Sequence, residues 1–495
     1  MNEGDLPEGV KAGVHAPRGA EEPPGQESEG PYERRSACNG RGAKGPREVD
    51  GVKPTQSERA PATVPEATHA GEVRPRWAWT EPMVWTDRML TALEQGVKGG
   101  VWYSLIDKVC AERTLRAAWQ HVKANGGAAG VDHVTVAMYE RDLDRNLTTL
   151  TMQLTAGTYR PQPIRRTWID QPGSREQRPL GIPSVRDRVV QTAMRMVLEP
   201  IFERDFAAHS YGFRPRRGCK DALRRVDSLL AAGCTWIVDA DLRHYFDTIP
   251  RMPLMQRIRE KVADGRVLAL LEAFLTQPVM EELSTWTPDE GTPQGAVISP
   301  LAANFYLDSL DHHMAASACE MVRYADDFVI LCRSEADAQR ALTLVTTWTQ
   351  AAGLTLHPDK TRIVDARQHG GFDFLGYHFE RGRHWPRAKN LQKLKDTVRA
   401  KTPRSRGQSL AVIIDDVNRT LRGWFQYFQH SPRPTFIHLD AWVRMRLRSI
   451  LRRRHRRLGR GRGRDHQRWP NAFFAAQGLY SLTTAHVASC QSVRR

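Results

Sequence analysis

The segment MVRYADDFVILC, residues 321–332, constrains the fold more than any other part of the chain. Two short β-prone runs flank an Asp-Asp pair, and a tight turn between such runs is typical of a β-hairpin. An isolated Asp pair would merely hydrate a turn, because Asp favours turns for its own side-chain hydrogen bonds. Here the residues on both sides are too apolar for a solvated loop. We therefore expect a hairpin whose turn carries Asp326 and Asp327.

A third aspartate ends a second strand pattern. The segment CTWIVDADL, residues 234–242, is short, apolar and β-rich, as expected of a buried strand. Pairing of this strand with the hairpin would bring Asp241 to Asp326 and Asp327. Three carboxylates at close range repel one another unless a cation lies among them, and Mg²⁺ prefers carboxylate oxygens. Because two such ions catalyse phosphoryl transfer to a sugar hydroxyl, we expect these residues to be catalytic and to bind two Mg²⁺ ions, with Mn²⁺ as a substitute.

Other segments show where regular structure is expected. Apolar residues at helical spacing predict helices near residues 93–105, 185–206, 256–275 and 410–428. The first 75 or so residues hold ten of the thirty prolines and few large apolar side chains, so they cannot offset the entropy of ordering. We expect a disordered leader, with folded structure starting near Trp85.

Several motifs resemble the sequence blocks of reverse transcriptases encoded by group II introns, and they occur in the same order as in that family. The turn Tyr-Ala-Asp-Asp, residues 324–327, resembles the catalytic turn of that family. The other blocks, in chain order, are GVDHVT at 130–135, RPLGIPSVRDRVVQTA at 178–193, SYGFRPRRGCKDAL at 210–223, DADLRHYFDTIP at 239–250, GTPQGAVISPLAANFYLDSLD at 291–311, GLTLHPDKT at 353–361 and FDFLGYHF at 372–379. The resemblance covers about residues 85 to 490 and is strongest from 178 to 380.

The resemblance implies an α+β fold, the right-hand polymerase. Its fingers and its palm, with a ferredoxin-like sheet, precede an α-helical thumb and a basic C-terminal region. The implied domains are a disordered leader (1–84), an N-terminal extension with the fingers (85–236), the catalytic palm (237–385), the thumb or maturase domain (386–440) and a basic DNA-binding region (441–495). Asp241, Asp326 and Asp327 match the family's catalytic and metal-binding triad. Asp239 would lie about 7 Å back along its strand, so a structural hydrogen-bonding role is expected there rather than metal binding.

The resemblance also implies contacts to the incoming deoxynucleoside triphosphate. Phe246 follows Asp241 by five residues, where the family places an aromatic ring that would clash with a 2′-hydroxyl; ordinary core packing is the alternative. Gln294 resembles the residue that touches the nucleotide and its template pair, and Arg178 resembles the arginine that clamps the triphosphate. Lys360 resembles a late-block lysine, and we expect it to protonate the leaving pyrophosphate or to act only through its charge.

One position departs from the family pattern. Where many relatives have a lysine a few residues before the clamping arginine, this chain has Gln171, with Arg175 nearby. The sequence leaves open whether Arg175 replaces that lysine.

The charge of the chain predicts a polyanionic partner. Its formal net charge is +17, and residues 444–468 hold twelve arginines with Asp465 as the only acid. Arginine binds phosphates through two hydrogen bonds, and Trp442 and Trp469 offer stacking surfaces. A solvated charge run is the alternative. The residues expected to contact nucleic acid are Tyr324, Arg422, Arg452, Arg453, Arg454, Arg456 and Arg457.

Composition predicts the compartment. There is no long apolar run and no secretory signal, which favours a bacterial cytoplasmic protein near the nucleoid, and seven scattered cysteines favour reduced thiols. No His-Asn-His pattern with cysteine pairs follows residue 470, so no DNA endonuclease activity is expected.

The resemblance implies an RNA-directed DNA polymerase that binds its own intron RNA. Such a protein assists splicing as a maturase, and it copies the RNA into DNA from a primer at the insertion site during retrohoming. Two alternatives remain at this point. One is a catalytically silent RNA-binding splicing factor, against which the intact acidic triad argues. The other is a domesticated reverse transcriptase of phage defence or a CRISPR locus.

Overall fold

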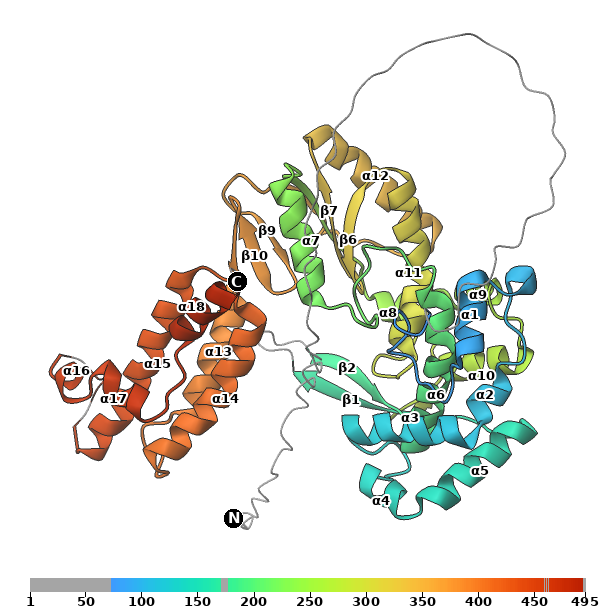
Figure 1. The fold of residues 1–495 in the computed structure, drawn as a ribbon, viewed down its shortest axis with the longest axis horizontal. Helices are drawn as coiled ribbons and strands as arrows, with labels where there is room; N and C mark the ends of the chain where they lie inside the picture. Colours follow the sequence, from blue (N-terminus) through green and yellow to red (C-terminus); the bar gives the residue numbers. More distant parts are fainter. Residues whose placement is uncertain (1–72, 171–176, 458, 460, 462, 493–495) are drawn as a thin grey trace, which may run out of the picture.

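A computed structural model describes residues 73–170, 177–457, 459, 461 and 463–492. The described chain forms a mixed α/β body and a second, purely helical lobe, drawn from orange to red in Figure 1. None of the described helices is long and apolar enough to cross a membrane.

A four-stranded antiparallel sheet carries the acidic motifs. It consists of β3 (Trp236–Asp241), β6 (Glu320–Tyr324), β7 (Asp327–Cys332) and β8 (Arg362–Asp365), in the order β6-β7-β3-β8. The predicted hairpin is confirmed as β6 and β7 with a two-residue turn, and the predicted strand near 234–242 is confirmed as β3. Helices join β3 to β6 and β7 to β8, which makes a split βαβ arrangement.

Alternate side chains of this sheet face two different layers, as strand geometry requires. Val238, Phe328 and Ile330 pack into the large core with α11 (Ser299–Ala316) and α12 (Glu335–Ala351). Ile237 and Val329 pack against α7 (Cys219–Ala231) and a small sheet of β9 (Phe372–Phe374), β10 (Tyr377–Glu380) and β11 (Arg383–Pro386). The sheet is therefore covered on both faces.

A second sheet also has four strands. Its order is β2-β1-β4-β5, with β1 (Ile164–Asp170), β2 (Gln177–Ile182), β4 (Val279–Glu281) and β5 (Ser284–Trp286). Strand β1 pairs antiparallel with β2 and parallel with β4.

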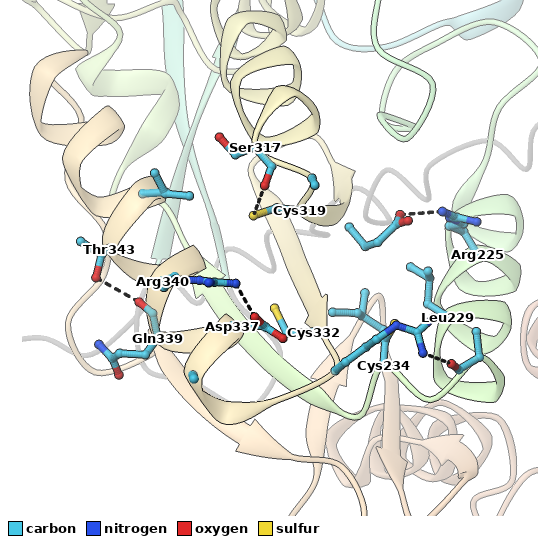
Figure 2. Close-up of a pocket in the computed structure, with 17 residues that line it drawn as sticks. Arg225, Leu229, Cys234, Ser317, Cys319, Cys332, Asp337, Gln339, Arg340 and Thr343 are labelled. Carbon is cyan, nitrogen blue, oxygen red and sulfur yellow. Dashed lines mark hydrogen bonds and ion pairs between the residues drawn. The ribbon is translucent and has the colours of Figure 1, made fainter. Parts of the chain in front are cut away.

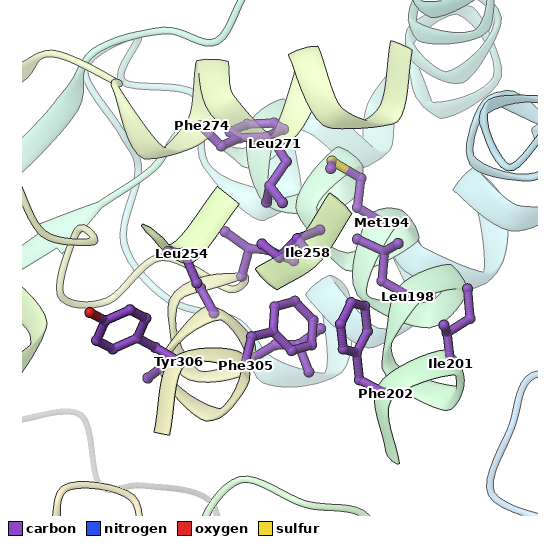
Figure 3. Close-up of a cluster of buried hydrophobic side chains, with 14 of the residues drawn as sticks. Met194, Leu198, Ile201, Phe202, Leu254, Ile258, Leu271, Phe274, Phe305 and Tyr306 are labelled. Carbon is purple, nitrogen blue, oxygen red and sulfur yellow. The ribbon is translucent and has the colours of Figure 1, made fainter. Parts of the chain in front are cut away.

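Helices of the N-terminal half and of the centre build the largest core. They are α1 (Asp87–Gln95), the 3-10 helix η1 (Lys98–Gly100), α2 (Ile106–Cys110), α3 (Glu112–Asn125), α4 (Val136–Arg141), α5 (Leu143–Ala156), α6 (Val185–Glu203), α8 (Tyr245–Thr248), α9 (Arg251–Arg259) and α10 (Gly265–Leu275). The predicted helix at 185–206 is confirmed as α6. Figure 3 shows side chains of α6, α9, α10 and α11 meeting in one cluster, where the ring centroids of Phe202 and Phe305 lie 3.8 Å apart.

The helical lobe contains α13 (Ala388–Lys401), α14 (Leu410–Phe428), α15 (Arg433–Arg454), α16 (Asp465–Arg468), α17 (Asn471–Ala476) and α18 (Leu482–Ser492). The helix predicted near 410–428 is confirmed as α14, whose apolar stripe packs against α15 and the segments that follow it. The lobe is tied to the body by α14, because Tyr377 donates a hydrogen bond to the Tyr427 carbonyl at 2.8 Å and Tyr427 donates one to the Leu375 carbonyl at 2.8 Å.

Three expectations about element boundaries were wrong. The helix expected at 93–105 ends at Gln95, because Gly96, Gly99 and Gly100 all have positive φ. The helix expected at 256–275 is two helices, α9 and α10, since the Asp264 side chain caps a new helix by accepting hydrogen bonds from the Arg266 and Val267 amides. Ordered packing also begins before Trp85, because the Trp77 side chain is buried in the large core.

Candidate active site

The pairing of β3 with β7 gathers the predicted acidic residues. In the register of these strands Asp241 lies opposite Asp327, and the turn of Ala325 and Asp326 follows directly. Burial raises the pKa of Asp327 to about 7, and the neighbouring charges of Asp239, Asp241 and Asp326 add to this shift. Burial likewise raises the pKa of Asp326, with Asp241 adding to it. The carboxylates are therefore close enough to oppose each other's ionisation.

Cationic side chains already compensate part of this negative charge. The Lys360 ammonium lies 2.5 Å from Asp241 Oδ2, and Arg362 Nε lies 3.3 Å from Asp239 Oδ2. Asp239 thus has the structural partner that a non-ligand role predicts. The Lys360 side chain is 60% exposed, so it can turn away from Asp241.

The donor chemistry of this cluster fits a hard divalent cation. Among the described residues, no three Asp, Glu, His or Cys side chains are arranged as ready ligands of one ion. Nevertheless, the cluster offers carboxylate oxygens, and two of its carboxyls hold their protons more tightly than usual, chiefly because they are buried and also because other carboxylates surround them. A cation bound here would replace those protons and the Lys360 contact.

A buried arginine contacts the acidic turn, which we define as Ala325, Asp326 and Asp327. The sequence motifs did not single out this arginine. Arg323, on β6, is 1% exposed, and its guanidinium makes a bidentate ion pair with Asp311 of α11 at 2.7 and 2.5 Å. It also donates to the Ala325 carbonyl at 2.8 Å, to Ser210 Oγ at 2.7 Å and to Asn304 Oδ1 at 3.1 Å. The sequence does contain a signal for this role: Arg323 lies inside an apolar strand pattern. A charge in such a position is buried only when it is paired.

The segment around Gly212 packs directly against the same turn. Tyr211 donates its amide hydrogen to the Arg323 carbonyl at 2.9 Å, and Asn304 Nδ2 donates to the Gly212 carbonyl at 2.8 Å. A Cβ at Gly212 would lie 2.2 Å from the Ala325 nitrogen. Glycine is therefore required there by the close approach of the two backbones rather than by its own φ.

Two of the residues expected to bind a nucleotide, Arg178 and Gln294, form a hydrogen-bonded chain with Asp247. Arg178 Nε donates to Gln294 Oε1 at 3.1 Å, and Gln294 Nε2 donates to Asp247 Oδ2 at 3.0 Å. The charge of Arg178 also lowers the pKa of Asp326, against the stronger effect of burial. The guanidinium therefore lies near both the Gln294 loop and the acidic turn.

Phe246 lies on the short helix α8, between the acidic cluster and the Gln294 loop. It is 9% exposed and its carbonyl accepts a hydrogen bond from the Thr292 amide at 2.6 Å. Gly291 has φ +84°, and a Cβ there would meet the Asp247 carbonyl oxygen at 2.6 Å and the Phe246 carbonyl oxygen at 2.7 Å. The loop of residues 291–295 therefore fits closely over α8. Gln171 and Arg175 lie outside the described residues.

The expected nucleic-acid contacts fall into two groups. Arg453, Arg454, Arg456 and Arg457 are exposed at the end of α15, and Arg422 is exposed on α14 with its guanidinium 5.6 Å from the Tyr480 ring centroid. Arg452, in contrast, makes an ion pair with the buried Asp465 at 2.7 Å. Tyr324 is half-buried, with its ring centroid 6.4 Å from that of Phe213. These contacts stay predictions.

The expectation that Trp469 offers a stacking surface was wrong. Its side chain is 6% exposed and belongs to the core of the helical lobe. Trp442 is half-buried, with the Arg399 guanidinium 5.7 Å from its ring centroid.

A large hollow in the described part of the chain lies away from the acidic cluster. This cavity of about 1180 Å³ lies between α7, α12 and the open end of the β6-β7 hairpin. Figure 2 shows residues that line it. It is lined by Glu320 and Cys332, at the end of the hairpin opposite the turn. Two of the arginines that line it, Arg225 and Arg340, are paired with Glu320 and Asp337. The carboxylates of Asp326 and Asp327 do not line this cavity, and both residues are half-buried at the turn end of the β6-β7 hairpin.

Known proteins match both parts of the chain. Residues 169–379 match the family described as "Reverse transcriptase (RNA-dependent DNA polymerase)", and residues 391–469 match "Group II intron, maturase-specific domain". Protein YkfC of Escherichia coli is 32% identical over 62% of this chain and 86% of its own length. Group II intron-encoded protein LtrA of Lactococcus lactis is 36% identical over 39% of this chain. That match spans about a third of LtrA, 32% of its length.

A telomerase structure from Candida albicans is similar at 13% identity over 64% of this chain and 63% of that chain, with a TM-score of 0.35. The matches to the two sequence families are far more specific, since they cover the acidic motifs and the helical lobe in chain order. The chain therefore belongs to the reverse transcriptases encoded by group II introns, with a polymerase region followed by a maturase-specific region.

Proposed function

We propose that this protein is an RNA-directed DNA polymerase that extends a primer on intron RNA and also binds that RNA to assist its splicing. One observation carries the polymerase half of the proposal: the β3-β7 register sets Asp241 beside the turn of Asp326 and Asp327. Neighbouring carboxylates with raised pKa values suit a site that receives a polyanion together with its cations.

In this proposal the three aspartates would hold two Mg²⁺ ions, or Mn²⁺ in their place, which would supply activation of the primer's 3′-hydroxyl and neutralisation of charge on the phosphate. Arg178 binds the triphosphate and keeps Gln294 oriented through its hydrogen bond. Phe246 closes the space where a 2′-hydroxyl would lie, and Gln294 touches the nucleotide opposite its template base. Lys360 turns from Asp241 toward the leaving pyrophosphate, either as a proton donor or as a charge.

The proposed subdomains follow from these roles. The β6-β7-β3-β8 sheet is the palm, at 237–385. The β2-β1-β4-β5 sheet belongs mainly to the fingers, at 85–236, although β4 and β5 lie at 279–286, within the range expected for the palm. The helical lobe is the thumb or maturase domain followed by the basic region. Together these parts would grip an RNA–DNA duplex and the intron RNA.

Primer extension tests the enzyme. The full chain is incubated with an oligo-dT primer on poly(rA), dTTP and Mg²⁺, and the extended product is measured. We expect extension by the unaltered protein and none by Asp326→Asn, because loss of one carboxylate removes charge from the cation site. Asp415→Asn, at an exposed position of α14, is the matched control and should extend normally.

Failure of the unaltered protein to extend with either Mg²⁺ or Mn²⁺ would leave the RNA-binding splicing factor as the better function. Full activity of Asp326→Asn would show that the acidic turn is not the reaction centre.

A further inference from the structure

The second sheet carries an exposed cluster of two indoles and a guanidinium. The Arg166 guanidinium carbon lies 5.6 Å from the Trp168 ring centroid and 5.0 Å from that of Trp286. Trp168 is 45% exposed and Trp286 is 36% exposed. Single exposed tryptophans need no explanation, but two that share one arginine make a continuous flat surface. We call Arg166, Trp168 and Trp286 the indole platform.

The platform is held in shape by the sheet. Trp168 Nε1 donates a hydrogen bond to Glu281 Oε1 at 2.5 Å, which ties β1 to β4. The Arg166 guanidinium makes no hydrogen bond or ion pair with another described residue, so its N–H donors remain available to a ligand. The Trp168 ring of the platform is thus held by a hydrogen bond, whereas the Arg166 guanidinium has donors that a ligand can use.

The platform adjoins the proposed nucleotide site from one side. A cavity of about 150 Å³ is lined by Arg166 and Trp286 together with Asp247 and Gln294. Cross-strand neighbours share a face of a sheet. Trp168 lies opposite Pro179, whereas Arg178 lies opposite Ile169. Arg178 and the platform therefore start from opposite faces of the sheet.

We propose that the indole platform binds the unpaired template RNA ahead of the base that is being copied. This inference rests on the proposed polymerase function. In this proposal, a nucleotide whose triphosphate is bound by Arg178 lies on the face of the sheet opposite the platform. The nucleotide pairs with a template base, and the template is the strand that continues past that base pair toward the platform. Aromatic rings stack on any base, and arginine contacts bases or phosphates, so the platform suits a single strand of varying sequence.

Binding of matched templates tests the platform. A DNA primer is annealed to RNA templates that extend one or eight nucleotides beyond it, and dissociation constants for the full chain are measured by fluorescence anisotropy. The ratio of the two constants is the overhang gain. We expect the long overhang to bind more tightly, and we expect Trp168→Ala and Trp286→Ala each to reduce the gain by about five- to hundredfold, the range for loss of one base stack.

Conservative and control variants separate stacking from folding. Trp286→Phe should retain most of the gain, because a phenyl ring still stacks. Tyr103→Ala removes another exposed aromatic ring, 64% exposed and outside the platform, and should leave the gain unchanged. As a second readout, 2-aminopurine in the overhang should be quenched on binding by the unaltered protein and less by Trp168→Ala.

Three outcomes would overturn the proposal. An unchanged gain in both alanine variants would show that no template base stacks there. Equal weakening of binding to both templates in the alanine variants would assign the tryptophans to duplex binding or to folding. A raised KM for the nucleotide on the short template would assign the platform to the incoming nucleotide. Single-nucleotide extension on the short template by the unaltered protein tests the polymerase function separately, so the two failures are distinguishable.

Discussion

At the scale of single residues, Arg323 shows how a buried charge can hold the turn of Ala325 and Asp326 in place. Its guanidinium joins Asp311, Asn304 and Ser210 to the Ala325 carbonyl of the acidic turn. Ala325 has φ +58°, in the left-handed region that non-glycine residues rarely adopt. The hydrogen bond that Arg323 donates to its carbonyl and the packing of Gly212 against it offset that conformational cost.

Removing one member of this network should destabilise the protein strongly. We expect Arg323→Gln to lower the free energy of unfolding by about 3 to 5 kcal/mol, because Asp311 is left as an uncompensated buried charge. The double variant Arg323→Met with Asp311→Leu should recover most of that stability, since apolar replacement of a buried pair is often neutral. Urea unfolding followed by tryptophan fluorescence measures both effects.

The double variant also tests whether the Arg323 network positions the acidic turn for primer extension. Although folded, it lacks the hydrogen bonds to Ala325 and Ser210, so we expect slow primer extension. Extension at the rate of the unaltered protein would show that the network supports folding alone.

Phe246 allows a test of sugar selection. We expect Phe246→Val to lower the preference for deoxynucleotides over ribonucleotides by about tenfold or more, because the space that the ring fills becomes open to a 2′-hydroxyl. Phe246→Tyr keeps the ring and should retain the preference. The measurement is the ratio of kcat/KM for dTTP and UTP on poly(rA). An unchanged ratio in Phe246→Val would make Phe246 an ordinary core residue.

At the scale of elements, local signals and long-range contacts can disagree. Helix α6 formed as its apolar periodicity predicts, with Ser184 accepting a hydrogen bond from the Asp187 amide as its N-cap. Between α9 and α10 the apolar periodicity of the sequence continues, yet the helix is interrupted there. Asp264 caps α10 and also accepts a hydrogen bond from the Ile106 amide at 2.8 Å, 158 residues away. That second bond cannot be read from a local pattern.

Helix α6 also makes stability depend on pH through Glu199. Burial raises the pKa of Glu199 to about 7, with Glu203 adding to the shift and Arg195 opposing it. Because its pKa exceeds that of an unfolded glutamate, the folded protein binds the extra proton, and its free energy of unfolding falls as pH rises from about 4.5 to about 7. Above that range the loss is complete.

We therefore expect Glu199→Gln to gain stability relative to the unaltered protein as pH rises through this range, by on the order of 2 to 3 kcal/mol. Urea unfolding at pH 5, 6, 7 and 8 measures the difference. Glu260→Gln, at an exposed position, should show no such trend. A constant difference between Glu199→Gln and the unaltered protein across the series would contradict the burial of an ionisable group at this position.

At the scale of the whole molecule, the arginine-rich region contains both buried, paired arginines and exposed ones. Some of its arginines are structural: Arg448 is 2% exposed and donates to the Trp469 carbonyl at 2.9 Å, and Arg452 is paired with Asp465. Others, including Arg453, Arg456 and Arg457, are exposed. The number of arginines in the region therefore exceeds the number that can contact phosphates.

The exposed arginines should set the salt dependence of RNA binding. We expect the triple variant Arg453→Gln, Arg456→Gln and Arg457→Gln to reduce the slope of log affinity against log salt by about 0.7 to 0.9 for each phosphate that an arginine no longer neutralises. The measurement is filter binding of the RNA that copurifies with the protein, over a salt series. Replacing Arg224, Arg340 and Arg381, exposed on the body, removes equal charge and should leave the slope nearly unchanged. Equal slopes in the two triple variants would place the RNA elsewhere.

The sequence by itself determined the parts that depend on neighbours along the chain. Apolar periodicity and turn residues were enough for the hairpin of residues 320–332, for strand β3 and for helices α6 and α14. The order of the motifs was enough for the family. These features are local, because the period of a strand or helix and the residues of a tight turn are set within a few positions.

Only the tertiary structure decided which side chains meet. The register of β3 with β7, the partners of Arg323 and the burial of Trp469 depend on elements far apart in the chain. The indole platform joins β1 to β5, two strands that do not pair with each other. Such contacts follow from the packing of whole layers, so a residue's type and its local pattern do not specify its partner.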